Sequence, residues 1–209
     1  MDKTGIANLA LSNLGEARIQ SLTENSSRAR ACSARIDGVL ETVLRMAVWN
    51  SALERKLLTQ IDAPLFGWNY TFQLPSDCIK VVEVEPVSKF HVEKRNILSN
   101  ETTLYLLYVA TPTDTNNLDS LLAEAIAMKL AVEVAETLTS KEGLKQEMAQ
   151  KYFLALQEAR SANSRDKTPE HRERSSWLDA KKGRYSVKHR TFNTPTIGYE
   201  VDMQAWKTK

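Results

Sequence analysis

The chain has 209 residues, of which 42% are hydrophobic and 26% are charged, and its formal net charge at pH 7 is +2. This is the composition of an ordinary globular protein, and no apolar run approaches the ~20 residues that a membrane-spanning helix requires. The start, MDKTGIANLALSNLG, also lacks the succession of basic, apolar and small residues that marks a secretory signal peptide. We therefore expect a soluble protein that neither enters a membrane nor is exported by a signal peptide.

The charge is divided unevenly along the chain. Residues 164–209 hold 11 Lys and Arg against 6 Asp and Glu, a net charge of +5, which leaves 17 against 20 and a net charge of −3 for residues 1–163. The first part therefore offers no obvious surface for a polyanion.

Helical periodicity predicts two helices before residue 50. Apolar residues recur at helical spacing up to Gly15, a glycine at a helix-ending position, and predict a first helix over 4–15. A longer apolar stripe begins after a pair of serines that can cap it and continues to Trp49, which predicts a second helix over 27–49.

The period changes to two in the middle of the chain. Residues 51–60 form a transition, and apolar and polar residues then alternate in short runs between Tyr70 and Ala110. This alternation predicts five short antiparallel strands within about 68–110, with Pro86 ending one of them.

The helical pattern then returns and predicts helices over 119–139 and 141–163, the first so rich in alanine that its neighbours can approach closely. The predicted fold class is therefore α+β. It consists of a four-helix body, 1–163, with a small antiparallel β subdomain inserted between helices two and three, and an extended C-terminal arm, 164–209.

The arm has almost no core-forming rhythm, yet it carries regularly spaced aromatic residues among basic ones. The side chains that we predict to dock on a partner are Trp177, Lys181, Lys182, Arg184, Tyr185, Lys188, Arg190, Phe192, Tyr199 and Trp206. Each ring can anchor the arm, and each neighbouring charge can fix its register. The interleaved Thr-Pro and Gly-Tyr turns favour a groove on another protein, and a nucleic acid whose bases stack on the rings is the alternative.

Residues that could carry catalysis or bind a metal are scattered. They are His91, His171, His189 and the acidic pairs Glu83 with Glu85 and Glu133 with Glu136. No histidine has a second ligand at metal-binding spacing, and solvent-facing positions on a strand and a helix explain the acidic pairs. The basic cluster Arg28, Arg30 and Arg35 is a candidate nucleic-acid contact, and a solvated or intersubunit face is favoured over it. We therefore expect no enzymatic activity, no cofactor and no metal site.

The cysteines, Cys32 and Cys78, lie far apart among apolar neighbours. Two free, buried thiols are favoured over a disulfide, and free thiols favour a reducing compartment.

Five stretches between Ile6 and about Ala162 occur in an order that a known family shares. They are IANLALSNLGEARIQSL, VLRMAVWNSALERKLL, YTFQLPSDCIKVVEV, LYLLYVA and LLAEAIAMKLAVEVAETLTS. The most specific parts are the Trp49-Asn50 step and the LPSDC corner before alternating valines. Together they resemble the head-to-tail adaptors of tailed bacteriophages, and most closely the tail tubular protein A, or gatekeeper-type, family of short-tailed phages. The chain departs from the family on both sides of Trp49-Asn50. Ser51 stands where an aromatic residue is common, and Met46, Ala47 and Val48 stand where His-Pro is usual.

The resemblance implies a structural virion protein with a role in tail assembly and DNA ejection. It implies a dodecameric ring below the portal, with C-terminal arms on the portal protein and the β part facing the tail nozzle or another tail protein. DNA would pass through the central channel without sequence-specific binding. The resemblance also implies a place in the neck of the virion after assembly in the host cytoplasm.

The arm matches the family only in kind, so its portal contacts are not transferred residue by residue. Trp49 and Pro75, which lie in the matching motifs, are expected to be structural. The alternative function that the residues leave open is a small nucleic-acid-binding regulator with a basic arm.

Overall fold

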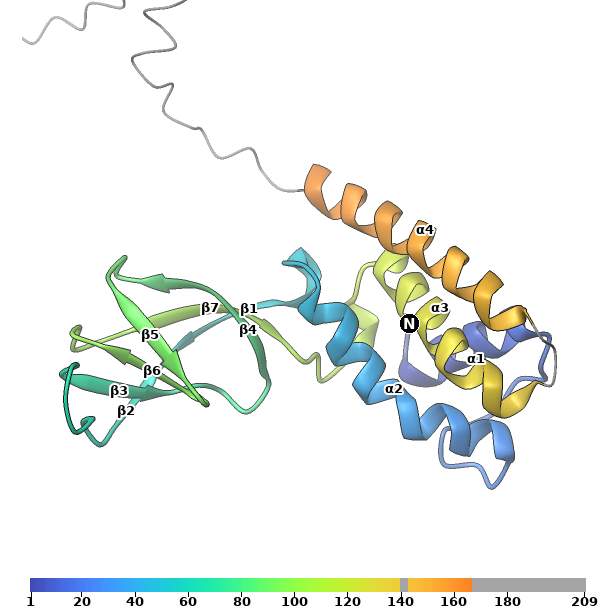
Figure 1. The fold of residues 1–209 in the computed structure, drawn as a ribbon, viewed down its shortest axis with the longest axis horizontal. Coiled ribbons are helices and arrows are strands. Elements are labelled where there is room, and N and C mark those ends of the chain that lie inside the picture. The colour runs from blue at the N-terminus through green and yellow to red at the C-terminus, as the bar shows by residue number, and fades with distance from the viewer. Residues whose placement is uncertain (140–142, 167–209) are drawn as a thin grey trace, which may run out of the picture. The chain divides into compact units, whose positions relative to one another are not determined.

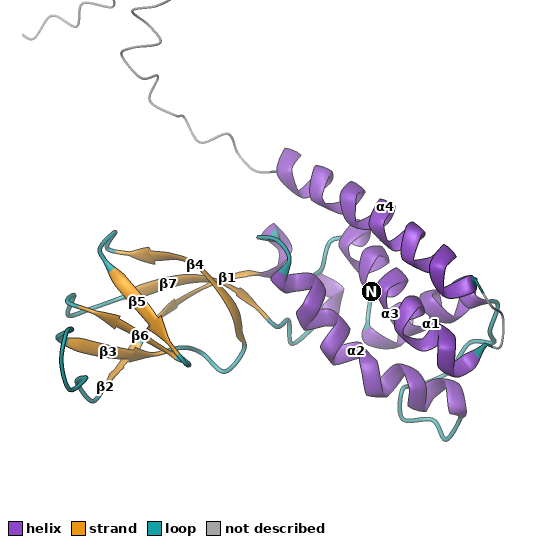
Figure 2. Ribbon diagram, viewed as in Figure 1, coloured by secondary structure: helices purple, strands orange, loops and turns teal. Residues whose placement is uncertain are grey.

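The computed structural model of the protein describes residues 1–139 and 143–166. Within these residues the fold is α+β, with four α-helices and an antiparallel β region inserted between the second and the third (Figures 1 and 2). The predicted fold class is therefore confirmed. The helices are α1, Lys3–Leu14, α2, Ser27–Arg45, α3, Ser120–Leu138, and α4, Leu144–Arg165. None of the helices in this part of the chain is both long and apolar enough to cross a lipid bilayer.

Side chains cap three of these helices at their N termini. The caps are Asp2, Ser26 and Asp119, whose oxygens accept backbone N–H groups of the first turn at 2.8, 3.2 and 3.0 Å. They fix the helix starts because the first N–H groups of a helix have no intrahelical acceptor. Gly15 ends α1 with a φ of 76°, a left-handed conformation that glycine adopts without a Cβ penalty. The first helix is therefore found within one residue of its predicted bounds.

The second helix ends earlier than predicted. The expected end was Trp49, but α2 stops at Arg45 and Trp49 has extended backbone angles, φ −93° and ψ 120°. The indole Nε1 of Trp49 donates a hydrogen bond of 3.1 Å to the carbonyl of Val43. This carbonyl is one of the last four of the helix, which lack an α-helical donor. The Met46 N–H also donates to this carbonyl, at 3.2 Å, so the tryptophan is a second donor at the helix end and does not extend the helix.

Helix α3 lies at the centre of the helical core and contacts α1, α2 and α4 (Figure 1). Its alanines are at most 2% exposed, and they are Ala123, Ala125, Ala127, Ala131 and Ala135. Such small residues let neighbouring helices approach closely. Helix α4 buries one stripe of side chains, Met148, Tyr152, Leu156 and Ala159.

The β region contains seven strands in two antiparallel sheets. The strands are β1, Leu53–Leu57, β2, Thr59–Ile61, β3, Tyr70–Gln73, β4, Cys78–Glu85, β5, Phe90–Glu93, β6, Asn96–Ser99, and β7, Tyr105–Ala110. The first sheet has the order β1-β7-β4 and the second the order β2-β3-β6-β5. Strand β4 ends directly before Pro86, as predicted.

The five strands predicted within about 68–110 correspond to β3–β7, but β1 and β2, which precede this range, were not predicted. All three residues of β2 are exposed, and in β1 only Leu53 is partly buried. Both are edge strands, which carry charged and polar side chains and need no alternating apolar face. The period-two signal was therefore absent from LERKL and TQI.

The two sheets share one apolar core, which includes Phe72 and Ile97 from the second sheet and Leu106 and Tyr108 from the first. The other face of the first sheet joins the helical core at one end, where Val109 is fully buried. Arg45 at the end of α2 also donates a 2.7 Å hydrogen bond to the carbonyl of Ile79 in β4. The inserted β region is therefore connected to the helices by apolar packing and by a polar contact.

Candidate partner-binding surfaces

Two segments far apart in the sequence are joined at the end of α4. The side chain of Asn163 accepts a hydrogen bond from the Asn50 N–H at 2.8 Å and donates one to the Val48 carbonyl at 2.8 Å. The Asn50 side chain donates to the Asn163 carbonyl at 3.0 Å. We call this set of three bonds the Asn163 clasp. It ties the last turn of α4, which continues to Arg165, to the link between α2 and β1.

Trp49 lies at the same link and is 1% exposed. It belongs to the helical core together with Ala52 and Val109, which belong to the start and end of the β insertion. Such a position is that of a structural side chain, because a buried indole contributes a large apolar surface to the core. Its contribution to stability stays a prediction.

Pro75 forms a buried corner between β3 and β4. Its carbonyl accepts the Cys78 N–H at 3.1 Å and a guanidinium N–H of Arg95. The backbone N–H of Leu74 in turn donates to the Arg95 carbonyl at 2.9 Å. Both Pro75 and Trp49 are therefore buried.

The hydroxyl of Tyr108 joins the first sheet to this corner. The side chain is 1% exposed, and its oxygen lies 3.1 Å from a carboxylate oxygen of Glu54 and 3.2 Å from one of Asp77. Burial, followed by the negative charges of Asp77 and Glu54, raises the pKa of Tyr108 well above its usual range. The hydroxyl therefore stays protonated and donates to these carboxylates. This contact was not predicted, because Tyr108 is at least 31 residues away in the sequence from each carboxylate.

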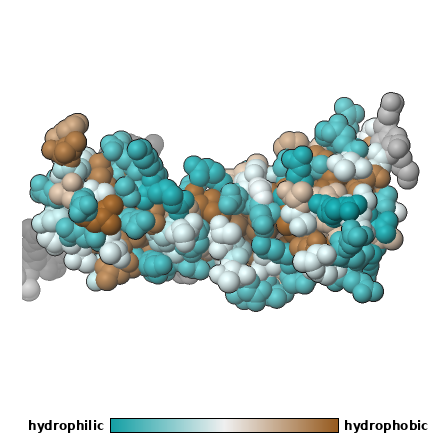
Figure 3. All heavy atoms as spheres, turned by 90° about the horizontal axis from the view of Figure 1, so that it is seen from below, coloured by the Kyte–Doolittle hydropathy of each residue, from teal (hydrophilic) through white to brown (hydrophobic). Residues whose placement is uncertain are grey.

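Large hydrophobic side chains are exposed mainly on the β region. Eight of the twelve in the described part of the chain lie between residues 57 and 105, namely Leu57, Ile61, Leu65, Phe66, Val87, Phe90, Val92 and Tyr105. Figure 3 shows hydrophobic residues standing at the surface of this region on the face that it draws. On the helices, Phe153 and Leu154 of α4 are each 67% exposed. Surfaces of this kind mark contacts with other macromolecules.

An open groove of about 490 Å³ lies on the first sheet. Two rows of cross-strand neighbours run across it, Leu57, Tyr105 and Glu85 in one and Arg55, Leu107 and Glu83 in the other. The rows are two residues apart on each strand and therefore share one face of the sheet. The groove thus has an apolar floor between a basic rim on β1, formed by Arg55, and an acidic rim on β4, formed by Glu83 and Glu85. We call it the sheet groove.

A second cleft, of about 560 Å³, lies between α2 and the β region. Its lining includes the cations Arg45, Lys80, Lys94 and Arg95 and one carboxylate, that of Glu41. Cys78 also lines it and is only partly buried, so the expectation of two buried thiols is correct for Cys32 alone. Burial raises the pKa of the Cys78 thiol, which disfavours the reactive thiolate at neutral pH.

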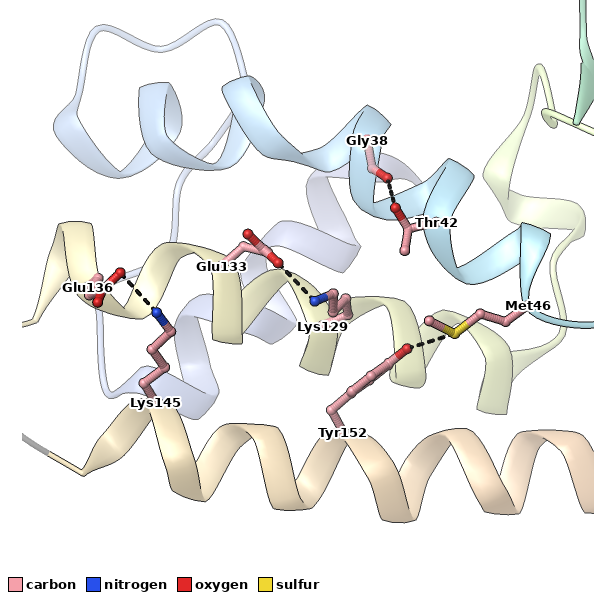
Figure 4. Close-up of polar contacts among 8 residues, drawn as sticks. All are labelled: Gly38, Thr42, Met46, Lys129, Glu133, Glu136, Lys145 and Tyr152. Atoms are coloured by element: carbon pink, nitrogen blue, oxygen red, sulfur yellow. Dashed lines mark hydrogen bonds and ion pairs between the residues drawn. The ribbon is translucent and has the colours of Figure 1, made fainter.

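The acidic pairs and the basic cluster do not assemble into a catalytic arrangement. Glu133 accepts a 2.8 Å hydrogen bond from Lys129, and Glu136 lies 2.9 Å from Lys145 of α4 (Figure 4). Ion pairs on the helix surface therefore account for both of these carboxylates. The same view shows the Tyr152 hydroxyl directed at the sulfur of Met46, 3.2 Å away.

The remaining candidates are equally dispersed. Glu83 and Glu85 are exposed on one face of β4, as predicted. His91 lies 3.7 Å from Glu93 and is well exposed, and Arg28 lies 3.7 Å from Glu16. Among residues 1–139 and 143–166, no group of three or more His, Cys, Asp or Glu side chains is arranged to hold a metal ion.

The predicted docking residues of the arm, from Trp177 to Trp206, lie outside the described residues, as do His171 and His189. Sequence reasoning did not find the sheet groove, because its floor is built from strands that are adjacent in space and distant in sequence. Compared with known proteins, the chain matches no family model, and a search of curated proteins finds no significant relative.

Proposed function

We propose that this protein is a structural virion component, the head-to-tail connector (adaptor) of a tailed bacteriophage. In this proposal its copies form a ring, dodecameric as in the family that the sequence resembles, with a channel through which DNA passes without sequence-specific binding. Residues 164–209 bind the portal, and the β region faces the tail nozzle or another tail protein. The ring assembles in the host cytoplasm and lies in the neck of the finished virion.

The observation that carries this proposal is the exposure of large apolar side chains on the inserted β region. Leu65 and Phe66 are 101% and 86% exposed, and Val87 is 83% exposed. The helical core, in contrast, is closely filled. So many exposed apolar side chains lower the solubility of a protein. They are retained where another protein covers them.

The Asn163 clasp supports the assignment of a separate docking arm. It holds the end of α4 against the link that leads into the β insertion, so the arm departs from a fixed point of the body. Many arms that leave fixed points on one ring bind a second ring with an affinity far above that of a single arm, because of their high effective concentration.

The test is cosedimentation with portal rings of the same phage. The full chain is compared with a chain that ends after Asp166, which keeps α4 and the clasp intact. We expect the shortened chain to remain folded by circular dichroism and to lose portal binding. If it binds portal rings as well as the full chain does, the proposed role of the arm is wrong.

Point variants of the full chain separate an apolar docking arm from a purely electrostatic one. Tyr185→Ala and Phe192→Ala should each weaken portal binding more than Lys181→Ala does, because desolvated rings dominate interfaces and rim charges contribute little. The series is measured at two salt concentrations, and only a weak salt dependence is expected.

A second candidate function, a nucleic-acid-binding regulator, is favoured by one observation. The cleft beside α2 carries four cations and one carboxylate, and the arm adds a net charge of +5. This function requires duplex DNA binding by the free chain with a steep salt dependence, since each phosphate contact releases a counterion. Fluorescence anisotropy with a labelled duplex measures this DNA binding directly. Among the arm variants, Lys181→Ala should then weaken binding more than Tyr185→Ala and Phe192→Ala do.

A further inference from the structure

The loop between β2 and β3, residues 62–69, presents an apolar tip to solvent. Leu65 and Phe66 at the tip are the most exposed large hydrophobic residues of the described chain. Gly67 follows them with a φ of 86°, a conformation in which a residue with a side chain is strained. The loop therefore turns sharply at its tip, and no described residue of the chain covers the two apolar side chains.

The sheet groove on β1, β7 and β4 has complementary properties. Its floor is apolar, with Leu57 55% and Tyr105 53% exposed, and its volume of about 490 Å³ leaves room for side chains. It is open along the sheet face, and nothing else in the described part of the chain fills it. A protruding apolar tip and an apolar groove thus occur on the same β region, in different places.

The polar residues beside the tip match the rims of the groove. Along the loop, the acidic Asp62 precedes the apolar tip and Trp68, whose indole N–H can only donate, follows it. Across the groove, a basic rim is followed by the apolar floor and then by an acidic rim. Asp62 and Trp68 lie on the two arms of the loop, whose ends are paired at Ile61 and Thr71. With the tip on the apolar floor, one orientation of the loop directs the Asp62 arm toward Arg55 and the Trp68 arm toward Glu83 and Glu85.

We infer that neighbouring copies of this chain join through these two surfaces, the 62–69 loop of one copy docking in the sheet groove of the next. Because the two surfaces are different, the contact is head to tail and repeats around a closed ring or along a filament. The contact itself is inferred from the two surfaces, and the closure of the ring rests on the proposed function. The contact between two copies, however, is testable without the portal.

Cysteine cross-linking of the full chain tests the contact. Phe66→Cys and Tyr105→Cys are introduced together in a Cys78→Ser background, which leaves only the buried Cys32 besides them. At high protein concentration, a short bifunctional thiol reagent should give a ladder of dimers, trimers and larger species, since every copy carries both halves of the contact. A matched control replaces Tyr105→Cys by Phe153→Cys, at a residue that is 67% exposed on α4, and should give no ladder.

Substitutions then show whether the ladder depends on the proposed contacts. Leu65→Ser should slow its formation about tenfold, because the tip loses an apolar side chain. Asp62→Lys should slow it about two- to fivefold, the scale of a rim ion pair, and Arg55→Glu in the same chain should restore it. Circular dichroism checks that each variant keeps its fold.

Each other outcome overturns a distinct statement. Cross-linking that stops at dimers means a two-fold contact and overturns the head-to-tail arrangement. A ladder that Leu65→Ser leaves unchanged means that the loop serves a different partner, such as a tail protein, and overturns the inference. A chain that forms the ladder but does not sediment with portal rings overturns the proposed function and leaves this contact standing. A chain that binds portal rings but forms no ladder overturns this contact and leaves the proposed function standing.

Discussion

Single residues hold the junctions of this fold. Trp49 fills the core beside the last turn of α2 and satisfies a carbonyl there, and Tyr108 joins β7 to the carboxylates of Glu54 and Asp77. Each makes contacts that span separate segments of the chain. Their loss should therefore affect the stability of the whole described fold.

Trp49→Ala should lower the free energy of unfolding by about 3–5 kcal/mol, because it removes a fully buried aromatic side chain. Trp49→Phe keeps most of the apolar volume and loses the hydrogen bond to Val43. It should lower the free energy of unfolding by less than Trp49→Ala does. Urea denaturation followed by circular dichroism measures both. An unchanged stability together with lost ring assembly would mean that Trp49 contacts a partner.

Tyr108→Phe should lower the free energy of unfolding at pH 7 by about 1.5–3 kcal/mol, the scale of hydrogen bonds to charged groups. Because the pKa of Tyr108 is higher in the folded protein than in the unfolded chain, its contribution is complete below about pH 10, the usual tyrosine pKa. The contribution is lost as the pH rises further, toward the folded pKa. The difference in stability between the wild type and Tyr108→Phe should thus be constant from pH 7 to 9 and narrow above pH 10. A difference that widens there would contradict the assignment of Tyr108 as a neutral donor.

At the scale of the elements, the four helices and the five strands β3–β7 were predicted from the sequence, whereas the end of α2 and the strands β1 and β2 were not. Caps such as Asp2 and the left-handed Gly15 are local features, so the bounds of α1 could be predicted from neighbouring residues alone. The end of α2 was misplaced because the apolar Trp49 packs against the helix end and does not lie on a further turn. Strands β1 and β2 were missed because their outward side chains are polar. The sheet groove was beyond prediction, since it depends on the pairing of β7 with both β1 and β4.

The Asn163 clasp gives a prediction at this scale. Asn163→Ala removes the acceptor for the Asn50 N–H and the donor to the Val48 carbonyl, while the backbone carbonyl of residue 163 remains. We expect the free energy of unfolding to fall by about 1–2 kcal/mol and hydrogen exchange at the Asn50 backbone amide to become faster. Ser164→Ala, which removes an exposed hydrogen bond within α4, is the control and should change neither. Equal exchange at Asn50 in wild type and Asn163→Ala would show that the clasp is not formed in solution.

At the scale of the whole molecule, the described chain has a filled helical core and apolar side chains exposed on its β region. A body that buries its own core can fold as a single copy, whereas in the proposed function the exposed side chains are covered by the assembly. Folding and ring formation are thus expected to be separate events in this protein.

Sedimentation velocity should accordingly find the free chain mainly as a monomer at low micromolar concentration and as a ring in the presence of portal rings. The reason is that one loop in one groove buries little surface, while a portal supplies many sites at once. Stable rings of the free chain at this concentration would show that copy-to-copy contacts alone are sufficient. The chain ending after Asp166 is the control and should remain monomeric with portal rings present.

The pairing of β1 with β7 has a mechanical consequence. These strands are the first and the last of the insertion, and they lie side by side, with Leu53 opposite Val109 and Leu57 opposite Tyr105. Short links connect both strands to the helices: residues 46–52 join α2 to β1, and residues 111–119 join β7 to α3. A force that pulls the β region away from the helices is therefore borne by two covalent backbones in parallel, and no single non-covalent contact has to carry the load.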